Sequence, residues 1–194
     1  NDYGVFLNAD ASSLERFKMY ETIVIDAQYF TKKDIEFLHQ NGTVVYTYLN
    51  IGSIESFRKY YTRYKDLTIG KYEHWEEEKW VDVANPDWQK FIGQLSQELY
   101  EKGVDGFFID NCDVYDYASR ENIFEGLTNI LQNIMTFGKA VIINGGDIYV
   151  AEYRDRYGEI EHIMTGVNQE SVWSSIDFDK GTFHEQTRET RDYF

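Results

Sequence analysis

Short apolar runs alternate along this chain with longer stretches in which apolar residues recur at helical spacing. Six of the runs are rich in β-branched and aromatic residues, as is typical of buried parallel strands. We predict these strands at Gly4–Asn8, Thr22–Asp26, Thr43–Leu49, Val104–Asp110, Ala140–Asn144 and His162–Gly166. A polar or amphipathic stretch of helical character follows each of them.

Three of the helical stretches have recognisable ends. One begins after Thr31, a good N-cap residue, and stops at an Asn-Gly pair. The next runs from Asn85 to Gly103 and has proline at its first helical position. The third spans Glu121–Phe137 and stops at a glycine. Their apolar stripes are predicted to be packing surfaces rather than ligand sites.

The repeated strand–helix–strand order predicts an α/β protein with a parallel sheet and helices outside it. The chain has no GxGxxG or Walker A loop, which argues against a nucleotide-binding doubly wound sheet. We therefore favour a (β/α)₈ barrel of the TIM type, in a single domain covering residues 1–194. Such barrels typically need about 250 residues. Either the barrel is truncated after about six βα units, or another chain completes it, or the sheet is open.

Charge and composition narrow the function classes. The chain has 34 acidic and 19 basic residues and a net charge of −15, so we expect no nucleic-acid partner. No apolar run is long enough for membrane insertion. The single cysteine, Cys112, excludes an internal disulfide, and no Cys/His spacing resembles a zinc site. We predict no cofactor and no metal, and the oligomeric state is left open.

The most informative stretch is Gly103–Asp113, where an apolar strand ends in a carboxylate, an amide and another carboxylate. In barrels the active site lies at the carboxyl ends of the strands. A charge there is costly unless it is paired or serves a ligand. Asp110 is therefore the leading active-site candidate. The alternative for it is a helix N-cap, a role that Asp113 fits better.

Other predicted strands also end in polar residues. These residues include Asp26, Asn50, Glu55, Asn144, Asp147, Asn168 and Glu170. Their recurrence at one rim predicts a cleft that binds hydroxyl groups.

Two carboxyl groups in such a cleft could catalyse glycoside hydrolysis. Glycoside hydrolysis usually uses two carboxyl groups, one that attacks or stabilises the cationic transition state and one that protonates the leaving oxygen. We choose Asp110 and Glu170, because both follow clear strands. The alternative for Glu170 is an ordinary loop carboxylate.

Four segments carry a family resemblance: Tyr48–Arg58, Trp80–Asp82, Val104–Asp113 and Gly166–Glu170. The stretch YxxIGxxExxR and the strand end DGxxxDNxD are the specific parts. In order and spacing the four resemble glycoside hydrolase family 114, which consists of endo-α-1,4-polygalactosaminidase-like (β/α) barrels. Two features depart from the family. Ile143 stands where many members have a lysine, and the last βα units are missing.

The resemblance implies hydrolysis of an α-1,4-linked, galactosamine-containing exopolysaccharide with retention of configuration. It makes Asp110 the nucleophile and Glu170 the general acid/base. With the polar strand ends, it gives a substrate-binding set of Asp26, Tyr48, Glu55, Asn111, Asp113, Asn144 and Asn168. The chain opens at Asn1 without a leader peptide, which is compatible with the mature form of a secreted or cell-surface protein.

Two other functions stay open. A non-catalytic carbohydrate-binding barrel would explain the missing units and the aromatic residues Tyr46, Tyr48, Tyr115, Tyr117 and Trp173, which can stack on sugar rings. A metal-dependent hydrolase would use Asp26, Asp110 and Asp113. The metal hypothesis is the weaker one, because the chain has only 4 histidines and none is near these aspartates in sequence.

Overall fold

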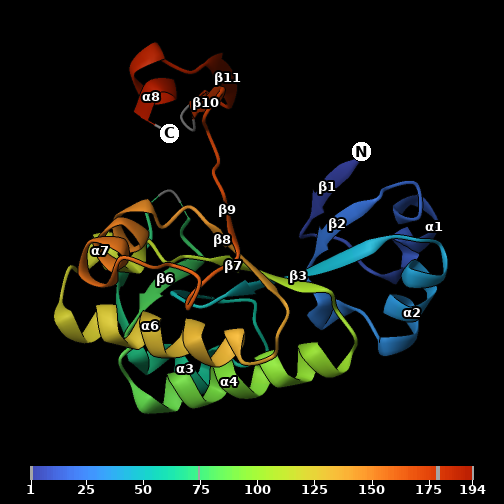
Figure 1. Ribbon diagram of the computed structural model, residues 1–194, viewed down its shortest axis with the longest axis horizontal. Coiled ribbons are helices and arrows are strands. Elements are labelled where there is room, and N and C mark those ends of the chain that lie inside the picture. Colours follow the sequence, from blue (N-terminus) through green and yellow to red (C-terminus); the bar gives the residue numbers. More distant parts are fainter. Residues whose placement is uncertain (1, 74, 178–179, 194) are drawn as a thin grey trace.

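The computed structural model describes residues 2–73, 75–177 and 180–193. Its main feature is a parallel sheet of six strands in the order β1-β2-β3-β7-β8-β9 (Figure 1). These strands are β1 (Tyr3–Phe6), β2 (Thr22–Ile25), β3 (Val44–Asn50), β7 (Gly106–Asp110), β8 (Ala140–Asn144) and β9 (Gly166–Asn168). Their spatial order follows their order in the chain, as in a TIM barrel. Within the described residues β1 and β9 do not pair with each other, so the sheet forms a partial barrel.

The predicted strands are recovered, with one shift. We expected the last strand at His162–Gly166, but it lies at Gly166–Asn168. Ile163 and Met164 are buried in the turn that precedes it, so their hydrophobicity reflects core packing and not strand pairing.

Helices follow the strands as the sequence predicts. The longer ones are α2 (Lys32–Gln40), α4 (Pro86–Glu101), α6 (Glu121–Met135) and α7 (Asp147–Tyr157). The shorter ones are η1 (Ala11–Ser13), α1 (Leu14–Phe17), η2 (Ala27–Tyr29), α3 (Tyr61–Tyr64), η3 (Lys65–Leu67), α5 (Val114–Tyr117) and α8 (Arg188–Tyr193). Thr31 and Asp34 form a full capping box at the start of α2, and Asn85 caps α4 through the Asp87 N–H. None of the helices in the described ranges is long and apolar enough to cross a membrane.

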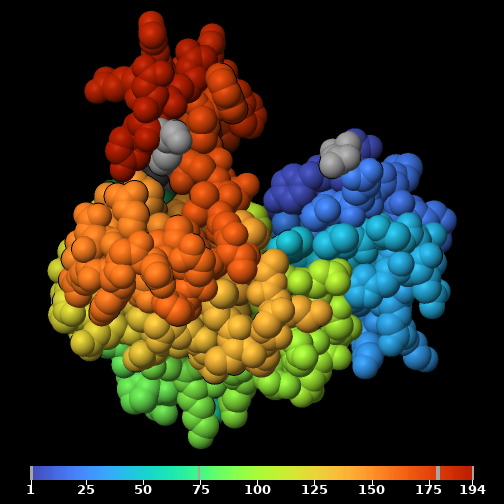
Figure 2. Space-filling view, in the orientation of Figure 1, coloured from blue at the N-terminus to red at the C-terminus, as the bar shows by residue number. Residues whose placement is uncertain are grey.

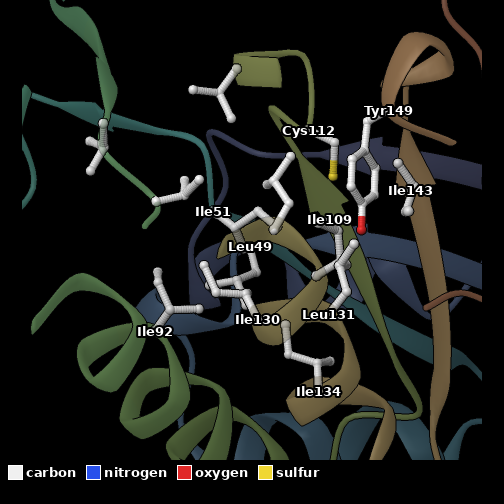
Figure 3. Packing of buried hydrophobic residues seen from close by; sticks show 14 of the residues in the cluster. Leu49, Ile51, Ile92, Ile109, Cys112, Ile130, Leu131, Ile134, Ile143 and Tyr149 are labelled. Carbon is white, nitrogen blue, oxygen red and sulfur yellow. The ribbon is translucent and has the colours of Figure 1, made fainter. Parts of the chain in front are cut away.

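The two faces of the sheet have different partners, because successive side chains along a strand point to opposite faces. Leu49, Ile109 and Ile143 face the helices and pack in a large buried core that includes residues of α4 and α6 (Figure 3). A smaller cluster centred on Tyr48 and Phe108 belongs to the other, concave face. The concave face corresponds to the interior of a barrel.

A small antiparallel sheet interrupts the strand–helix order after β3. It contains β4 (Ser53–Glu55), β5 (Thr68–Lys71) and β6 (Glu78–Val81), with β6 in the middle. Because β4 follows β3 after two residues, this sheet lies at the carboxyl end of the parallel strands. It brings side chains to that end from a part of the sequence that the barrel pattern does not cover.

The C-terminal segment stands apart from the rest of the protein. Figures 1 and 2 show the hairpin of β10 (Ser174–Asp177) and β11 (Thr182–Glu185), with α8, projecting beyond β9. The Tyr193 hydroxyl donates to Asp147 at 2.7 Å, which ties α8 to the start of α7.

Candidate active site

Strand register brings the polar strand ends together. Asn50 is opposite Asp110 across β3 and β7, and Asn144 is opposite Asn168 across β8 and β9. Asp110 follows Phe108 by two residues and therefore shares its concave face. Asn50, Asp110, Asn144 and Asn168 thus form one row on the inner side of the sheet. Asp147, also predicted at this rim, instead begins α7 and accepts a hydrogen bond from Tyr193.

Asp110 is held by two donors. The Tyr48 hydroxyl donates to Oδ2 at 2.8 Å, and the Asn144 amide donates to Oδ1 at 3.1 Å. Burial raises the pKa of Asp110 to about 6, although these two hydrogen bonds act to lower it, and the charge of Glu170 raises it further. The carboxyl group therefore ionises close to neutral pH.

Asn144 joins the two predicted catalytic carboxylates. Its Nδ2 donates to Asp110 and also to Oε1 of Glu170, at 3.0 Å. Asn168 donates to Oδ1 of Asn144 at 2.6 Å, which fixes the amide so that its nitrogen faces the carboxylates. Because both acceptor oxygens bond to one nitrogen, they are at most about 6 Å apart. The structure therefore places Asp110 and Glu170 side by side.

The turn after β8 depends on glycine. Gly145 and Gly146 both have a φ of 67°, in the left-handed region that residues with a side chain avoid. Asp113 accepts a hydrogen bond from the Gly146 N–H at 3.1 Å. Asp113 also occupies the N-cap position of α5, but its side chain makes no cap hydrogen bond there. Its carboxylate, predicted to bind substrate, holds this turn beside Asn144.

Asp26 and Glu55 meet at a third residue, Arg58. The guanidinium bonds to Asp26 Oδ2 at 2.5 Å and to the two oxygens of Glu55 at 2.9 and 3.2 Å. All three residues are buried. Burial opposes the charge on Arg58, but the hydrogen bonds and charge of Glu55 and then the charge of Asp26 outweigh it and hold the pKa of Arg58 above its ordinary value.

This ion pairing bears on the metal hypothesis. Asp26 bonds to Arg58 and Asp113 bonds to the Gly146 N–H, so the two do not join Asp110 as one set of ligands. In residues 2–73, 75–177 and 180–193, no three His, Cys, Asp or Glu side chains are grouped so that they could hold a metal ion.

Asn111 belongs to a polar network beneath the rim. Its Nδ2 donates to Ser53 Oγ and to Glu78 Oε1, both at 3.0 Å, and its Oδ1 accepts from the Tyr72 hydroxyl at 3.0 Å. Asn111 has a φ of 67°, a conformation that asparagine tolerates better than most residues. A side chain at Gly52 would collide with its backbone oxygen, so glycine is required there.

Three residues of this network, Ser53, Tyr72 and Glu78, were not predicted as site residues, and Glu78 is the charged one. It follows Glu76 and Glu77 in an acidic run that is typical of a solvated surface. Antiparallel pairing of β6 with β4 sets it opposite Glu55 and near the rim. Strand pairing therefore places Glu78 near the rim, a position that the local sequence pattern does not predict.

The predicted aromatic residues separate into different environments. Tyr115 is buried in the core against Phe124, whereas Trp173 is exposed in the C-terminal segment. Trp80 stacks between Tyr72 and Tyr117, with ring centroids 4.2 and 5.7 Å away. Of these rings, Tyr72 is the one that bonds to the polar network at the rim.

Comparison with known proteins identifies the family of the chain. The profile of glycoside hydrolase family GH114 matches residues 6–160. The chain belongs to family GH114. The matched range of this GH114 chain contains Asp110 and Asn144, whereas Asn168 and Glu170 lie after it.

Solved structures show the same fold at low sequence identity. The glycoside hydrolase domain of PelA from Pseudomonas aeruginosa is 19% identical, with a TM-score of 0.81 over 100% of this GH114 chain and 76% of that chain. Ega3 from Aspergillus fumigatus, in complex with galactosamine, is 19% identical, with a TM-score of 0.65 over 87% of this chain and 75% of that chain.

A curated relative is longer than this chain. An uncharacterised protein of Methanocaldococcus jannaschii is 24% identical over 154 residues, which cover 71% of this GH114 chain and 44% of the relative. The chain thus spans less than half the length of that relative.

Proposed function

We propose that this GH114 chain is a glycosidase that cleaves an α-1,4-linked, galactosamine-containing exopolysaccharide with retention of configuration. The observation that carries the proposal is the pair Asp110 and Glu170, bound to one amide nitrogen of Asn144. Retaining enzymes hold their two carboxyl groups about 5–5.5 Å apart, and the upper bound of about 6 Å between the bonded oxygens supports that class.

The proposed reaction has two steps. In the first, an Asp110 oxygen bonds to the anomeric carbon, the glycosidic C–O bond breaks, and Glu170 gives its proton to the leaving oxygen. In the second, the oxygen of a water molecule bonds to the anomeric carbon, Glu170 takes the water proton, and the bond to Asp110 breaks. Tyr48 and Asn144 keep the attacking carboxylate oriented through both steps.

The substrate assignment rests on chemistry and on similarity. Ega3, which shares the fold, was solved with galactosamine. A net charge of −15 suits a polymer with free, cationic amino groups. A polymer outside the cell would require a secreted or cell-surface location, which we include in the proposal.

A non-catalytic carbohydrate-binding barrel is the second candidate. The incomplete sheet favours it, because β1 and β9 each pair on one side only within the described residues. Such a protein would bind oligosaccharides in calorimetry without turnover, whereas release of reducing ends by this chain would exclude it.

Asp110→Asn and Glu170→Gln test the proposal directly. Each variant keeps the shape of the side chain and removes the nucleophile or the proton donor. We expect a loss of at least about 10³-fold in the release of reducing ends from partly deacetylated α-1,4-galactosamine polymer. Glu77→Gln, a charge removal on the exposed acidic run, is the matched control. Full activity in both variants would exclude this mechanism.

A further inference from the structure

Glu78 is fixed through one of its two oxygens. Oε1 accepts from Asn50 at 3.1 Å, from Asn111 at 3.0 Å and from the Ser53 hydroxyl. A carboxylate with several donors on one oxygen keeps a single orientation. The side chain is therefore preorganised before any ligand binds.

The other oxygen of Glu78 is open. Within the described ranges no donor bonds to Oε2, and no buried side-chain oxygen there lacks a partner, so Oε2 is in contact with solvent. No basic side chain in those ranges pairs with Glu78, although Arg58 neutralises the neighbouring Glu55. Burial raises the pKa of Glu78 although the three hydrogen bonds act to lower it, so its charged form is costly and a cationic ligand would stabilise it.

Glu78 shares its neighbours with Asp110, the proposed nucleophile. Its partner Asn111 directly follows Asp110, and its partner Asn50 is opposite Asp110 in the sheet. Asn111 also accepts a hydrogen bond from the Tyr72 hydroxyl, so Tyr72 belongs to the same polar network as Glu78.

We propose that the open oxygen of Glu78 binds an ammonium group of the sugar polymer and makes the enzyme prefer deacetylated substrate. The proposal rests on the proposed function, and it assigns to Glu78 the choice between free and N-acetylated amino sugars. Acetylation removes the positive charge and replaces it with a neutral amide, so the ion pair with Glu78 is lost.

Glu78→Gln tests this role with little change of shape. The glutamine oxygen still accepts from Asn50, Ser53 and Asn111, while its NH₂ group replaces Oε2 and repels an ammonium group. Two substrates of equal length are compared, a fully deacetylated and a fully N-acetylated α-1,4-galactosamine oligomer. We expect kcat/KM to fall about tenfold or more on the first and less than about threefold on the second. Glu77→Gln is the control and leaves both values unchanged.

An equal loss on both oligomers, or no loss on either, overturns the role of Glu78. Glu78→Asp keeps the charge and is expected to keep the preference, which separates recognition from a folding defect. Calorimetry separates this inference from the catalytic proposal. If wild type binds the deacetylated oligomer without cleaving it, the proposed hydrolysis fails, and the affinities of wild type and Glu78→Gln still decide the role of Glu78. If wild type binds neither oligomer, both proposals fail.

Discussion

Two pairs of carboxylates occupy the same rim of the sheet, and each pair is bridged by one side chain. Arg58 bridges Asp26 and Glu55 with a positive guanidinium. Asn144 bridges Asp110 and Glu170 with a neutral amide. The first pair is buried and shares one positive charge, whereas no cation in the described part of the chain forms an ion pair with the second. The charge of the bridging residue therefore suits the first pair to a structural role and the second to the proposed chemistry.

Arg58 and Asn144 also have different electrostatic effects on the carboxylates that they bridge. Arg58 places a positive charge between its two buried neighbours, Asp26 and Glu55. The amide of Asn144 donates hydrogen bonds but brings no charge, and burial raises the pKa of Asp110 to about 6. A group that changes protonation near neutral pH is useful to a catalyst and costly to a structure.

Removal of Arg58 should produce the largest change in stability. Arg58→Met leaves two buried carboxylates without a counter-charge, and we expect the free energy of unfolding to fall by about 3–5 kcal/mol. Urea denaturation followed by circular dichroism measures it. Arg154→Met removes an arginine whose pair with Asp155 is exposed, and this control should change stability by less than about 0.5 kcal/mol. Similar losses in the two variants would contradict the structural role of the Arg58 cluster.

Asp110→Asn should have a smaller and opposite effect on stability. The folded-state pKa of Asp110, about 6, is above the ordinary value of 3.8, so the folded protein holds this proton more tightly than the unfolded chain. The stabilisation is fully present below about pH 4 and is lost as the pH rises through about 6. The asparagine variant should therefore be about 1–3 kcal/mol more stable than wild type at pH 8, and the difference should shrink towards pH 4. Denaturation curves at both pH values measure this, and a variant less stable at pH 8 would contradict it.

Asn144→Leu should have the smallest effect of the three on stability and should act mainly on the pH profile. The Asn144 hydrogen bond lowers the pKa of Asp110, so its removal raises that pKa further. Asp110 then ionises only at higher pH, and the acidic limb of the kcat/KM profile should move upward by about half a unit to one unit. Lys79→Leu, on the same strand as Glu78 but outside this bridge, is the control. A downward shift would show that Asn144 does not stabilise the ionised form.

The strand ends could be predicted from sequence because they follow a local rule. Asp110 and Asn144 each end an apolar run, and the alternation of side chains carries them to one face. The same rule singled out Asp26 and Glu55 by residue type. It could not reveal that Arg58 binds both, because that contact depends on how the chain turns after β4.

Glu78 and the last strand show where sequence patterns are insufficient. The position of Glu78 depends on antiparallel pairing in a small sheet that has no counterpart in the strand–helix rhythm. Ile163 and Met164 were predicted to lie in a strand because they are apolar. Apolar character indicates that a residue is buried, but it does not show whether the backbone pairs with a strand. The position of Glu78 and the bounds of the last strand could therefore be assigned only from the tertiary structure.

The open sheet has a consequence for behaviour in solution. Within the described residues, β1 and β9 each have a strand on one side only, so backbone N–H and C=O groups along their outer edges can pair with another strand. The net charge of −15 counteracts such pairing between copies. Salt screens that repulsion beyond about 8 Å at physiological ionic strength. The colloidal stability of this chain should therefore decline as salt is added. The strand edges stay available for pairing, while the electrostatic repulsion between copies of the chain weakens.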